Sequence, residues 1–284
     1  MISTDCQLDN YRRDGYLVVP DLITPGEIER LRRDSADLAR GRYPSESLKP
    51  LPESMSDDEV QRRILCIHMP HHLSPVITEF IKHPAIVEVL TQIIGPDVKC
   101  MQSMLFVKPP GFQGQAWHQD EIYIPTRDRS LCGAWIAMDD ATQENGCLWV
   151  IPGSHEKGYL YPQKQHDNPD EFDSAQESFG FDDSAAVPVE VRAGAVVFFN
   201  GYLLHRSLRN RSSNDYRRAL VSHYMNAYSL LPWELKEGER VAIADRRSII
   251  LVAGTDPYAW KGYEQPGMEI YLRVCKANED LMGR

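Results

Sequence analysis

From residue 98 onward the chain consists of short β-rich segments separated by turn residues, and this pattern restricts the possible folds more than any other feature. Runs of valine, isoleucine and aromatic residues alternate with Gly, Pro and Asn-Gly, which is typical of antiparallel strands joined by tight turns. We therefore predict a mainly β protein with flanking helices, built on a double-stranded β-helix, the jelly-roll core of cupin-like proteins. The predicted strands are 98–108, 131–138, 147–151, 187–191, 195–199 and 217–224.

The first 97 residues instead show sequence patterns typical of α-helices. The sequence from Thr24 to Glu27 has the pattern of a capping box with proline at the first helical position. Apolar residues then continue at helical spacing to Leu38. Further predicted elements are a strand over 16–19, a polar surface loop over 41–63, and a helix from Ser74 to Ile94 interrupted at His83-Pro84.

We expect the 284 residues to form a single domain with three parts. These are a helical part (about 1–97), the jelly-roll core (about 98–228) and a C-terminal extension (about 229–284). An acidic insert over 157–186 has the length of a loop that serves as a lid or is disordered. In the extension, four aromatic residues either line a site or merely cover the barrel: Trp233, Trp260, Tyr263 and Tyr271.

Charge and composition narrow the classes of partner. The formal net charge of −10 argues against nucleic acid or an anionic membrane and favours a small-molecule substrate. No apolar run is long enough to span a membrane, and the first residues lack the apolar core of a signal peptide. Six cysteines without a Cys-x-x-Cys pair predict reduced core thiols and a cytoplasmic location. The oligomeric state stays open.

The sequence His118-Gln119-Asp120 follows an apolar, strand-like run. Side chains at i and i+2 of an extended segment point the same way, so His118 and Asp120 can reach one metal ion. A second histidine, His205, follows another apolar strand and a turn. Two histidines and one carboxylate form the facial triad that holds Fe(II) and leaves open positions. We predict His118, Asp120 and His205 as metal ligands.

An arginine pair, Arg217 and Arg218, begins the next predicted strand. Strand alternation places the two side chains on opposite faces, so only one can point into the barrel. A guanidinium there can bind the far carboxylate of a 2-oxoacid.

Two alternatives remain open at this point. Two histidines and a carboxylate also suit catalytic zinc, although the chain has no His-Glu-x-x-His motif. A cupin-like barrel can also bind a small molecule without catalysing a reaction. Alternatively, such a barrel can depend on zinc or manganese instead of iron.

Several motifs together resemble the phytanoyl-CoA dioxygenase family of Fe(II)- and 2-oxoglutarate-dependent oxygenases. The matching stretches are 14–18 (DGYLV), 104–110 (MLFVKPP), 117–125 (WHQDEIYIP), 134–139 (AWIAMD), 145–148 (NGCL), 151–155 (IPGSH), 205–207 (HRS) and 216–219 (YRRA).

The resemblance implies Fe(II), 2-oxoglutarate and O2 as cofactor and co-substrates, with His118, Asp120 and His205 as the catalytic iron ligands. It favours Arg217 over Arg218 for 2-oxoglutarate. It also implies a co-substrate pocket lined by Ser207, Trp135, Met104 and Gln102. Gln102 and Gln115 are further candidates for contacts with substrate.

The implied reaction is hydroxylation, or a related oxidation, of an unactivated C–H bond in a small organic molecule, with release of succinate and CO2. Halogenating relatives have Gly or Ala at the position of Asp120, so its carboxylate argues for hydroxylation. The chain departs from the family near Cys66–His68, where a lysine is missing and His68 is a candidate replacement. We expect Lys108 to be a solvated strand end and His223 to have a structural role.

Overall fold

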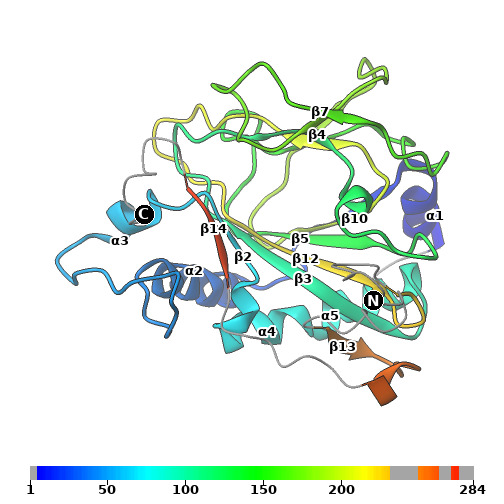
Figure 1. Cartoon of the computed structure of the whole chain (residues 1–284), viewed down its shortest axis with the longest axis horizontal. Coiled ribbons are helices and arrows are strands. Elements are labelled where there is room, and N and C mark those ends of the chain that lie inside the picture. Colours follow the sequence, from blue (N-terminus) through cyan, green and yellow to red (C-terminus); the bar gives the residue numbers. More distant parts are fainter. Residues whose placement is uncertain (1–4, 231–248, 262–269, 275–284) are drawn as a thin grey trace, which may run out of the picture.

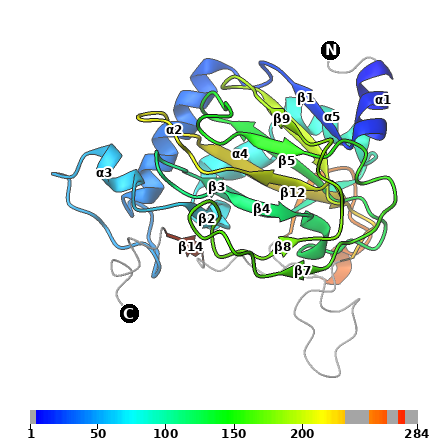
Figure 2. The same cartoon turned by 90° about the horizontal axis from the view of Figure 1, so that it is seen from above.

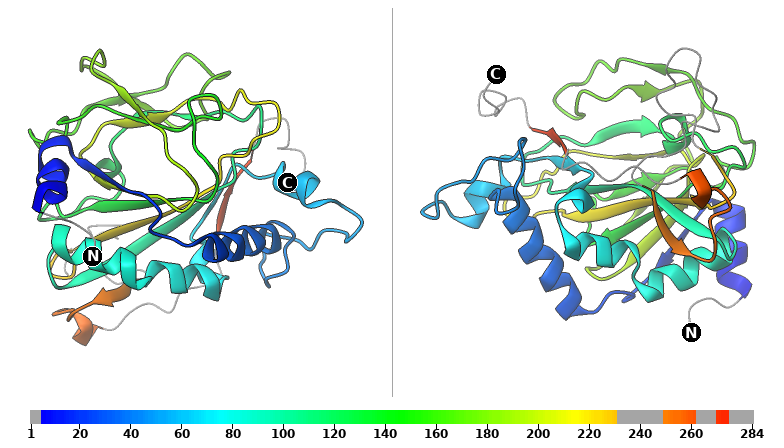
Figure 3. Two further views of the ribbon diagram at one scale, coloured as in Figure 1. Left: turned by 180° about the vertical axis from the view of Figure 1, so that it is seen from behind. Right: turned by 60° about the horizontal axis from the view of Figure 1, so that its bottom comes forward.

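The computed structural model describes residues 5–230, 249–261 and 270–274, and these form three layers (Figure 1). Helices cover one face of a large antiparallel sheet, and a smaller sheet lies over its other face. Views from behind and from beneath show α2, α4 and α5 on the same side of the large sheet (Figure 3). This arrangement of two facing antiparallel sheets with helices on one of them confirms the predicted jelly-roll class.

The helices lie mainly in the first third of the chain. Their bounds are α1 Asp5–Asp14, α2 Pro25–Ala39, α3 Asp57–Gln61, α4 Pro75–Ile81 and α5 Pro84–Ile93, with 3₁₀ turns η1 Pro70–His72, η2 Asp120–Ile122 and η3 Ala259–Lys261.

Antiparallel pairing connects strands from distant parts of the chain. In the described residues the large sheet has the order β1-β10-β5-β12-β3-β2-β14, with β13 also paired to β3, and the small sheet has the order β4-β11-β6-β9. The bounds are β1 Tyr16–Val19, β2 Cys66–His68, β3 Val98–Phe106, β4 Gln115–His118, β5 Cys132–Ala137, β6 Leu148–Val150, β7 Gln163–Lys164, β8 Glu177–Ser178, β9 Val187–Val189, β10 Val196–Asn200, β11 His205–Ser207, β12 Ala219–Asn226, β13 Ile250–Ala253 and β14 Tyr271–Arg273.

Alternation along the central strands sorts side chains between the two faces of the large sheet. On β5, Ala134 and Ile136 pack in the apolar core that the helices share, whereas Trp135 packs with residues of the small sheet. On β12, Leu220 faces the helices and Val221 faces the small sheet. The inner face between the two sheets is therefore available for a site, while the outer face carries the main core.

Most predicted elements are confirmed within a few residues. The capping box at Thr24 is present: Glu27 N–H donates to Thr24 Oγ1 over 3.4 Å, and Thr24 N–H donates to Glu27 Oε2 over 2.9 Å. The helix predicted from Ser74 is indeed broken before Pro84, giving α4 and α5.

Three predictions need correction. The loop expected over 41–63 contains α3, which a second capping box at Ser56 and Glu59 starts. The insert over 157–186 is not a disordered segment, because β7 and β8 pair within it and β8 runs beside β4 (Figure 2). Finally, Cys6 is exposed rather than part of the core, whereas the other described cysteines are buried and all five are free.

Part of the C-terminal extension lies outside the described residues, including Trp233, Tyr263 and Cys275. Of the aromatic residues predicted there, Trp260 and Tyr271 are 79% and 62% exposed, and neither lines the cavity described below. Among the helices that the structure describes, none has the length and apolar character needed to cross a membrane.

The Thr24 capping box generates a stability prediction. Replacing Thr24 by Ala removes the acceptor for the Glu27 N–H, and we expect the free energy of unfolding to fall by about 1 kcal/mol. Urea denaturation followed by far-UV circular dichroism measures this loss. Thr24→Ser keeps the acceptor and should stay within a few tenths of a kcal/mol of the parent; equal losses in both variants would contradict the capping role.

Candidate metal centre and cavity

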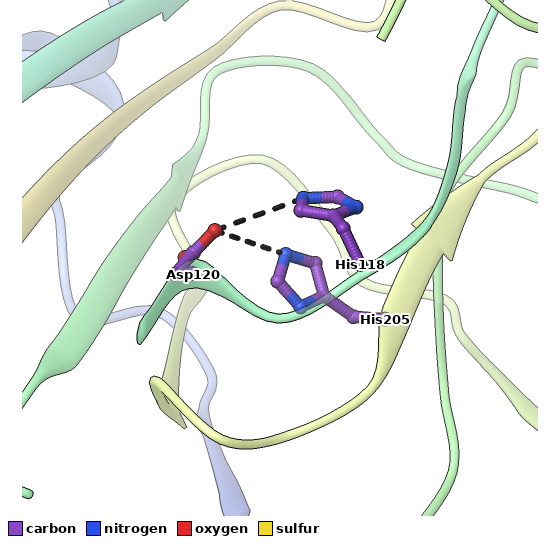
Figure 4. A group of neighbouring side chains, drawn as sticks. All are labelled: His118, Asp120 and His205. Atoms are coloured by element: carbon purple, nitrogen blue, oxygen red, sulfur yellow. Dashed lines mark ion pairs between the residues drawn. The ribbon is translucent and has the colours of Figure 1, made fainter. Parts of the chain in front are cut away.

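Pairing between β4 and β11 brings the three predicted metal ligands together. His118 ends β4 and lies opposite His205, the first residue of β11, while Asp120 opens the 3₁₀ turn that follows β4. Asp120 Oδ1 lies 3.7 Å from the Nε2 atom of each histidine (Figure 4). One ligand atom from each residue lies within 4.8 Å of the others. The predicted convergence is therefore present in the fold.

Hydrogen bonds orient both imidazoles for metal binding. His118 Nδ1 lies 2.8 Å from the carbonyl oxygen of Ala116, and His205 Nδ1 lies 3.0 Å from that of Leu203. Each Nδ1 must carry the proton in such a contact, which leaves the lone pair of Nε2 facing Asp120. Two imidazole nitrogens and one carboxylate oxygen on one side of a cavity match the donor set of a non-haem Fe(II) site.

His223 completes this arrangement from the inner face of β12. Its Nε2 lies 2.9 Å from Asp120 Oδ2, so Oδ1 is the oxygen left to face His118 and His205. Burial raises the pKa of Asp120, but the imidazoles of His205, His223 and His118 outweigh burial and hold it below its ordinary value. The carboxylate is therefore ionised at neutral pH. The structural role expected for His223 is more specific than the sequence indicates, since it orients the central carboxylate.

A cavity of about 450 Å³ opens beside these three residues. All of the other predicted site residues line it, namely Gln102, Met104, Gln115, Trp135, Ser207 and Arg217. The functional roles of these residues remain proposals, but their assembly around one cavity agrees with the sequence prediction.

Arg217 and Arg218 point in opposite directions, as strand alternation predicts. The Arg218 guanidinium forms a two-point contact with Asp139, with distances of 2.8 and 2.7 Å. Arg217 is only 3% exposed and lines the cavity, where its Nε donates to the Gly146 carbonyl oxygen over 3.0 Å. No carboxylate of the described residues forms an ion pair with Arg217. Burial lowers its pKa to about 10, and it stays charged at neutral pH.

Lys108 contradicts the expectation of a solvated strand end. It is 1% exposed, and its Nζ donates to Ser207 Oγ and the Gly146 carbonyl oxygen, each over 3.2 Å, and also to the Leu208 carbonyl oxygen. Its side chain turns inward beneath the Asn145-Gly146 turn because these acceptors replace water. The position before two prolines gave no indication of this.

The cavity lining also contains an arginine that the sequence did not indicate. Arg273 on β14 lines the cavity, and β14 pairs with β2, where Cys66 lies opposite Arg273. Arg273 Nε donates to His68 Nε2 over 3.0 Å, and its Nη1 donates to Asp173 Oδ2 over 2.8 Å. This contact joins the C-terminal strand to the 157–186 insert. Only the strand pairing reveals it, because Arg273 and Asp173 are far apart in sequence.

Phe199 forms a floor beneath the metal ligands. Its ring centroid lies 4.9 Å from that of His205, and its ring packs against Gly133 on the neighbouring strand. A Cβ atom at Gly133 would lie 2.3 Å from Phe199 Cζ. The strand therefore needs a glycine here to leave room for the aromatic ring beside His205.

Comparison with known proteins agrees with this geometry. The family model described as Phytanoyl-CoA dioxygenase (PhyH) matches residues 11–219. The chain belongs to this family. The phytanoyl-CoA dioxygenase of Arabidopsis thaliana is 30% identical over 255 residues, covering 79% of this chain and 89% of the relative. The peroxisomal phytanoyl-CoA dioxygenase of Homo sapiens is 29% identical over 231 residues, covering 76% of this chain and 67% of the relative.

Solved structures of oxygenases share the fold. The non-heme monooxygenase ThoJ superposes with a TM-score of 0.66 at 22% identity, covering 88% of this chain and 84% of that one. EvdO2 from Micromonospora carbonacea var. aurantiaca, complexed with 2-oxoglutarate, gives a TM-score of 0.62 at 20% identity, covering 84% of this chain and 96% of that one. Family membership confirms the resemblance and the predicted class, an Fe(II)- and 2-oxoglutarate-dependent oxygenase; the zinc and non-catalytic alternatives are not favoured.

Buried histidines at and near the site predict an acid-sensitive fold. Burial lowers the pKa of His68, His71 and His118 from 6.5 to about 3, so the folded protein keeps them neutral while the unfolded chain binds protons. Stability is then fully present above pH 6.5 and declines as the pH falls from 6.5 towards 3, by on the order of 1 kcal/mol per unit for each histidine. Glu121, whose pKa burial raises to about 7, offsets part of this loss.

Urea unfolding of the metal-free protein at pH 7 and pH 5 measures the effect, and we expect a lower free energy of unfolding at pH 5. Equal stability at the two pH values would contradict the burial of neutral imidazoles.

Proposed function

We propose that this dioxygenase binds Fe(II) through His118, Asp120 and His205 and hydroxylates, or otherwise oxidises, an unactivated C–H bond of a small organic molecule. The single observation that carries the proposal is the meeting of three ligand atoms in one cavity with the buried Arg217 guanidinium, which forms no ion pair with any carboxylate that the structure describes. When bound, Fe(II) and 2-oxoglutarate supply the oxidising power: one oxygen atom of O2 goes to the substrate and the other to succinate, while CO2 leaves.

Arg217 is proposed to hold the distal carboxylate of 2-oxoglutarate. A buried cation without a counter-ion is costly, and a carboxylate that meets its planar fork removes that cost. The rings of Trp135 and Phe106 lie with their centroids 5.7 and 5.9 Å from Arg217 Cζ, so they form apolar walls for this end of the cavity. Such walls keep water away from the ion pair and strengthen it.

Lys108 is proposed to position this end of the cavity rather than contact the co-substrate. It shares the Gly146 carbonyl oxygen and Ser207 Oγ with Arg217, whose Nη2 lies 3.5 Å from Ser207 Oγ. Its three hydrogen bonds thereby fix the two groups against which the Arg217 guanidinium rests. The lysine that the family places near Cys66–His68 is absent, and His68 is instead engaged by Arg273.

We further infer that the helical part, the jelly roll and the C-terminal extension act as one domain. The helices share their apolar core with the large sheet, and both β13 and β14 pair with strands of that sheet. The absence of nucleic-acid partners and the cytoplasmic location stay predictions. Relatives from Bos taurus, Rattus norvegicus and Homo sapiens are named as peroxisomal.

Removing the central carboxylate tests the metal assignment. In Asp120→Ala, we expect Fe(II) affinity and 2-oxoglutarate-dependent succinate formation to fall by at least about 100-fold, because one of three ligand atoms is lost. Calorimetric titration with Mn(II) and a succinate assay measure the two effects. Glu190→Gln, which removes an exposed carboxylate outside the cavity, should behave like the parent. Full turnover in Asp120→Ala would show that the ligand assignment is wrong.

The adjacent arginines provide a matched pair for the co-substrate assignment. Arg217→Met should raise the KM for 2-oxoglutarate by roughly 10- to 100-fold, since charge-assisted hydrogen bonds to the carboxylate are lost. Arg218→Met removes the neighbouring guanidinium and its contact with Asp139, so it should lower stability while leaving this KM unchanged. Steady-state kinetics with thermal melting separates the two, and a raised KM in Arg218→Met alone would reverse the assignment.

A further inference from the structure

The balance of charge inside the cavity differs from that of the whole chain. The chain carries a formal net charge of −10, yet the lining contains three arginines and a single carboxylate, Asp120. The proposed function uses Asp120 for iron and Arg217 for 2-oxoglutarate. The Arg206 side chain stacks over Trp117, with Cζ 4.5 Å from the ring centroid. The proposed function leaves two lining arginines without a role, Arg206 and Arg273, and Arg273 is the one that hydrogen bonds to other side chains hold in place.

Two hydrogen bonds hold the Arg273 guanidinium in place, and N–H donors remain for a further partner. Nε donates to His68 Nε2, and Nη1 donates to Asp173 Oδ2, while Nη2 makes no hydrogen bond to any of the described residues. The side chain is 28% exposed, so it is reachable from the cavity. His68 accepts the Nε–H as a neutral ring, since burial and then Arg273 lower its pKa to about 3.

The rest of the cavity lining suits a compact organic molecule. Tyr123, Ile124 and Val221 supply apolar surface, and Gln102 and Gln176 supply amides. The cavity of about 450 Å³ must hold both 2-oxoglutarate and substrate, which limits the substrate to a small molecule. A single guanidinium with one free nitrogen can form a charge-assisted hydrogen bond to one carboxylate.

We propose that Arg273 binds a carboxylate of the substrate, so that the enzyme oxidises compact free organic acids. This inference rests on the proposed function, because it assigns the rest of the cavity to iron and 2-oxoglutarate. The acid group anchors at the C-terminal strand, and the C–H bond to be oxidised lies between that anchor and the metal ligands. Asp173 accepts only from Nη1, which leaves Nη2 for the substrate.

The test compares free acids with their uncharged methyl esters. The probes are octanoate, 3-phenylpropanoate and N-acetylleucine, each paired with its methyl ester, and binding is measured by calorimetry. The full-length protein is loaded with Mn(II), which keeps it from turning over, and is saturated with 2-oxoglutarate so that Arg217 is occupied. We expect at least one acid to bind about tenfold or more tightly than its ester.

Two variants separate an anion-binding role from a structural one. Arg273→Gln removes the charge and should abolish the preference for acid over ester. Asp173→Asn breaks the same ion pair but keeps the guanidinium, so the preference should remain. Arg211→Gln is the matched control, because it removes an exposed ion pair between the insert and the barrel, with Glu171, outside the cavity. The preference should remain in this variant too.

The proposal is overturned if no acid binds better than its ester, if the preference survives in Arg273→Gln, or if Asp173→Asn loses it equally. Calorimetric titration of 2-oxoglutarate tells this failure apart from failure of the proposed function. The Mn(II)-loaded parent and Arg273→Gln should bind 2-oxoglutarate with the same affinity. A parent that does not bind 2-oxoglutarate refutes the proposed function itself, and a loss confined to Arg273→Gln refutes only the substrate role of Arg273.

Discussion

The Asp120 carboxylate is the centre on which the site depends. Three imidazoles from three different strands converge on it: His118 and His205 on one oxygen and His223 on the other. Two of these strands belong to the small sheet and one to the large sheet. The carboxylate therefore ties the two sheets together at the proposed metal site, while the pairing of β4 with β11 sets the spacing between the proposed ligands.

Basic side chains lie at two places around the cavity. Arg217 lines it and shares hydrogen-bond acceptors with Lys108, whose pKa burial lowers well below its usual value, with Arg217 adding to the effect. Arg273 lies on the wall formed by the insert and the last described strand. An acidic chain has thus concentrated positive charge where the proposed ligands carry carboxylates. This local distribution, and not the net charge, determines what the cavity binds.

The sequence predicted the parts of the site that follow from local rules. Side-chain alternation correctly brought His118 and Asp120 to one place and separated Arg217 from Arg218, because both depend only on the two-residue period of a strand. Motif order was enough to assign the family and the fold. The sequence did not reveal Arg273 or the inward turn of Lys108. Their environments are created by strand pairing across many residues and by carbonyl acceptors that have no signature in the sequence.

Gly133 has a consequence for how such a cavity can change. Any larger residue there would clash with the Phe199 ring, which itself packs against His205, so this side of the cavity leaves little room for substitution. The insert and the terminal strand contact the barrel partly through an ion pair, backbone hydrogen bonds and short strand pairings, which tolerate changes of side chain more readily than this tight packing does. New substrate preferences can therefore evolve by remodelling these two peripheral segments, while the oxidation chemistry stays fixed on the barrel.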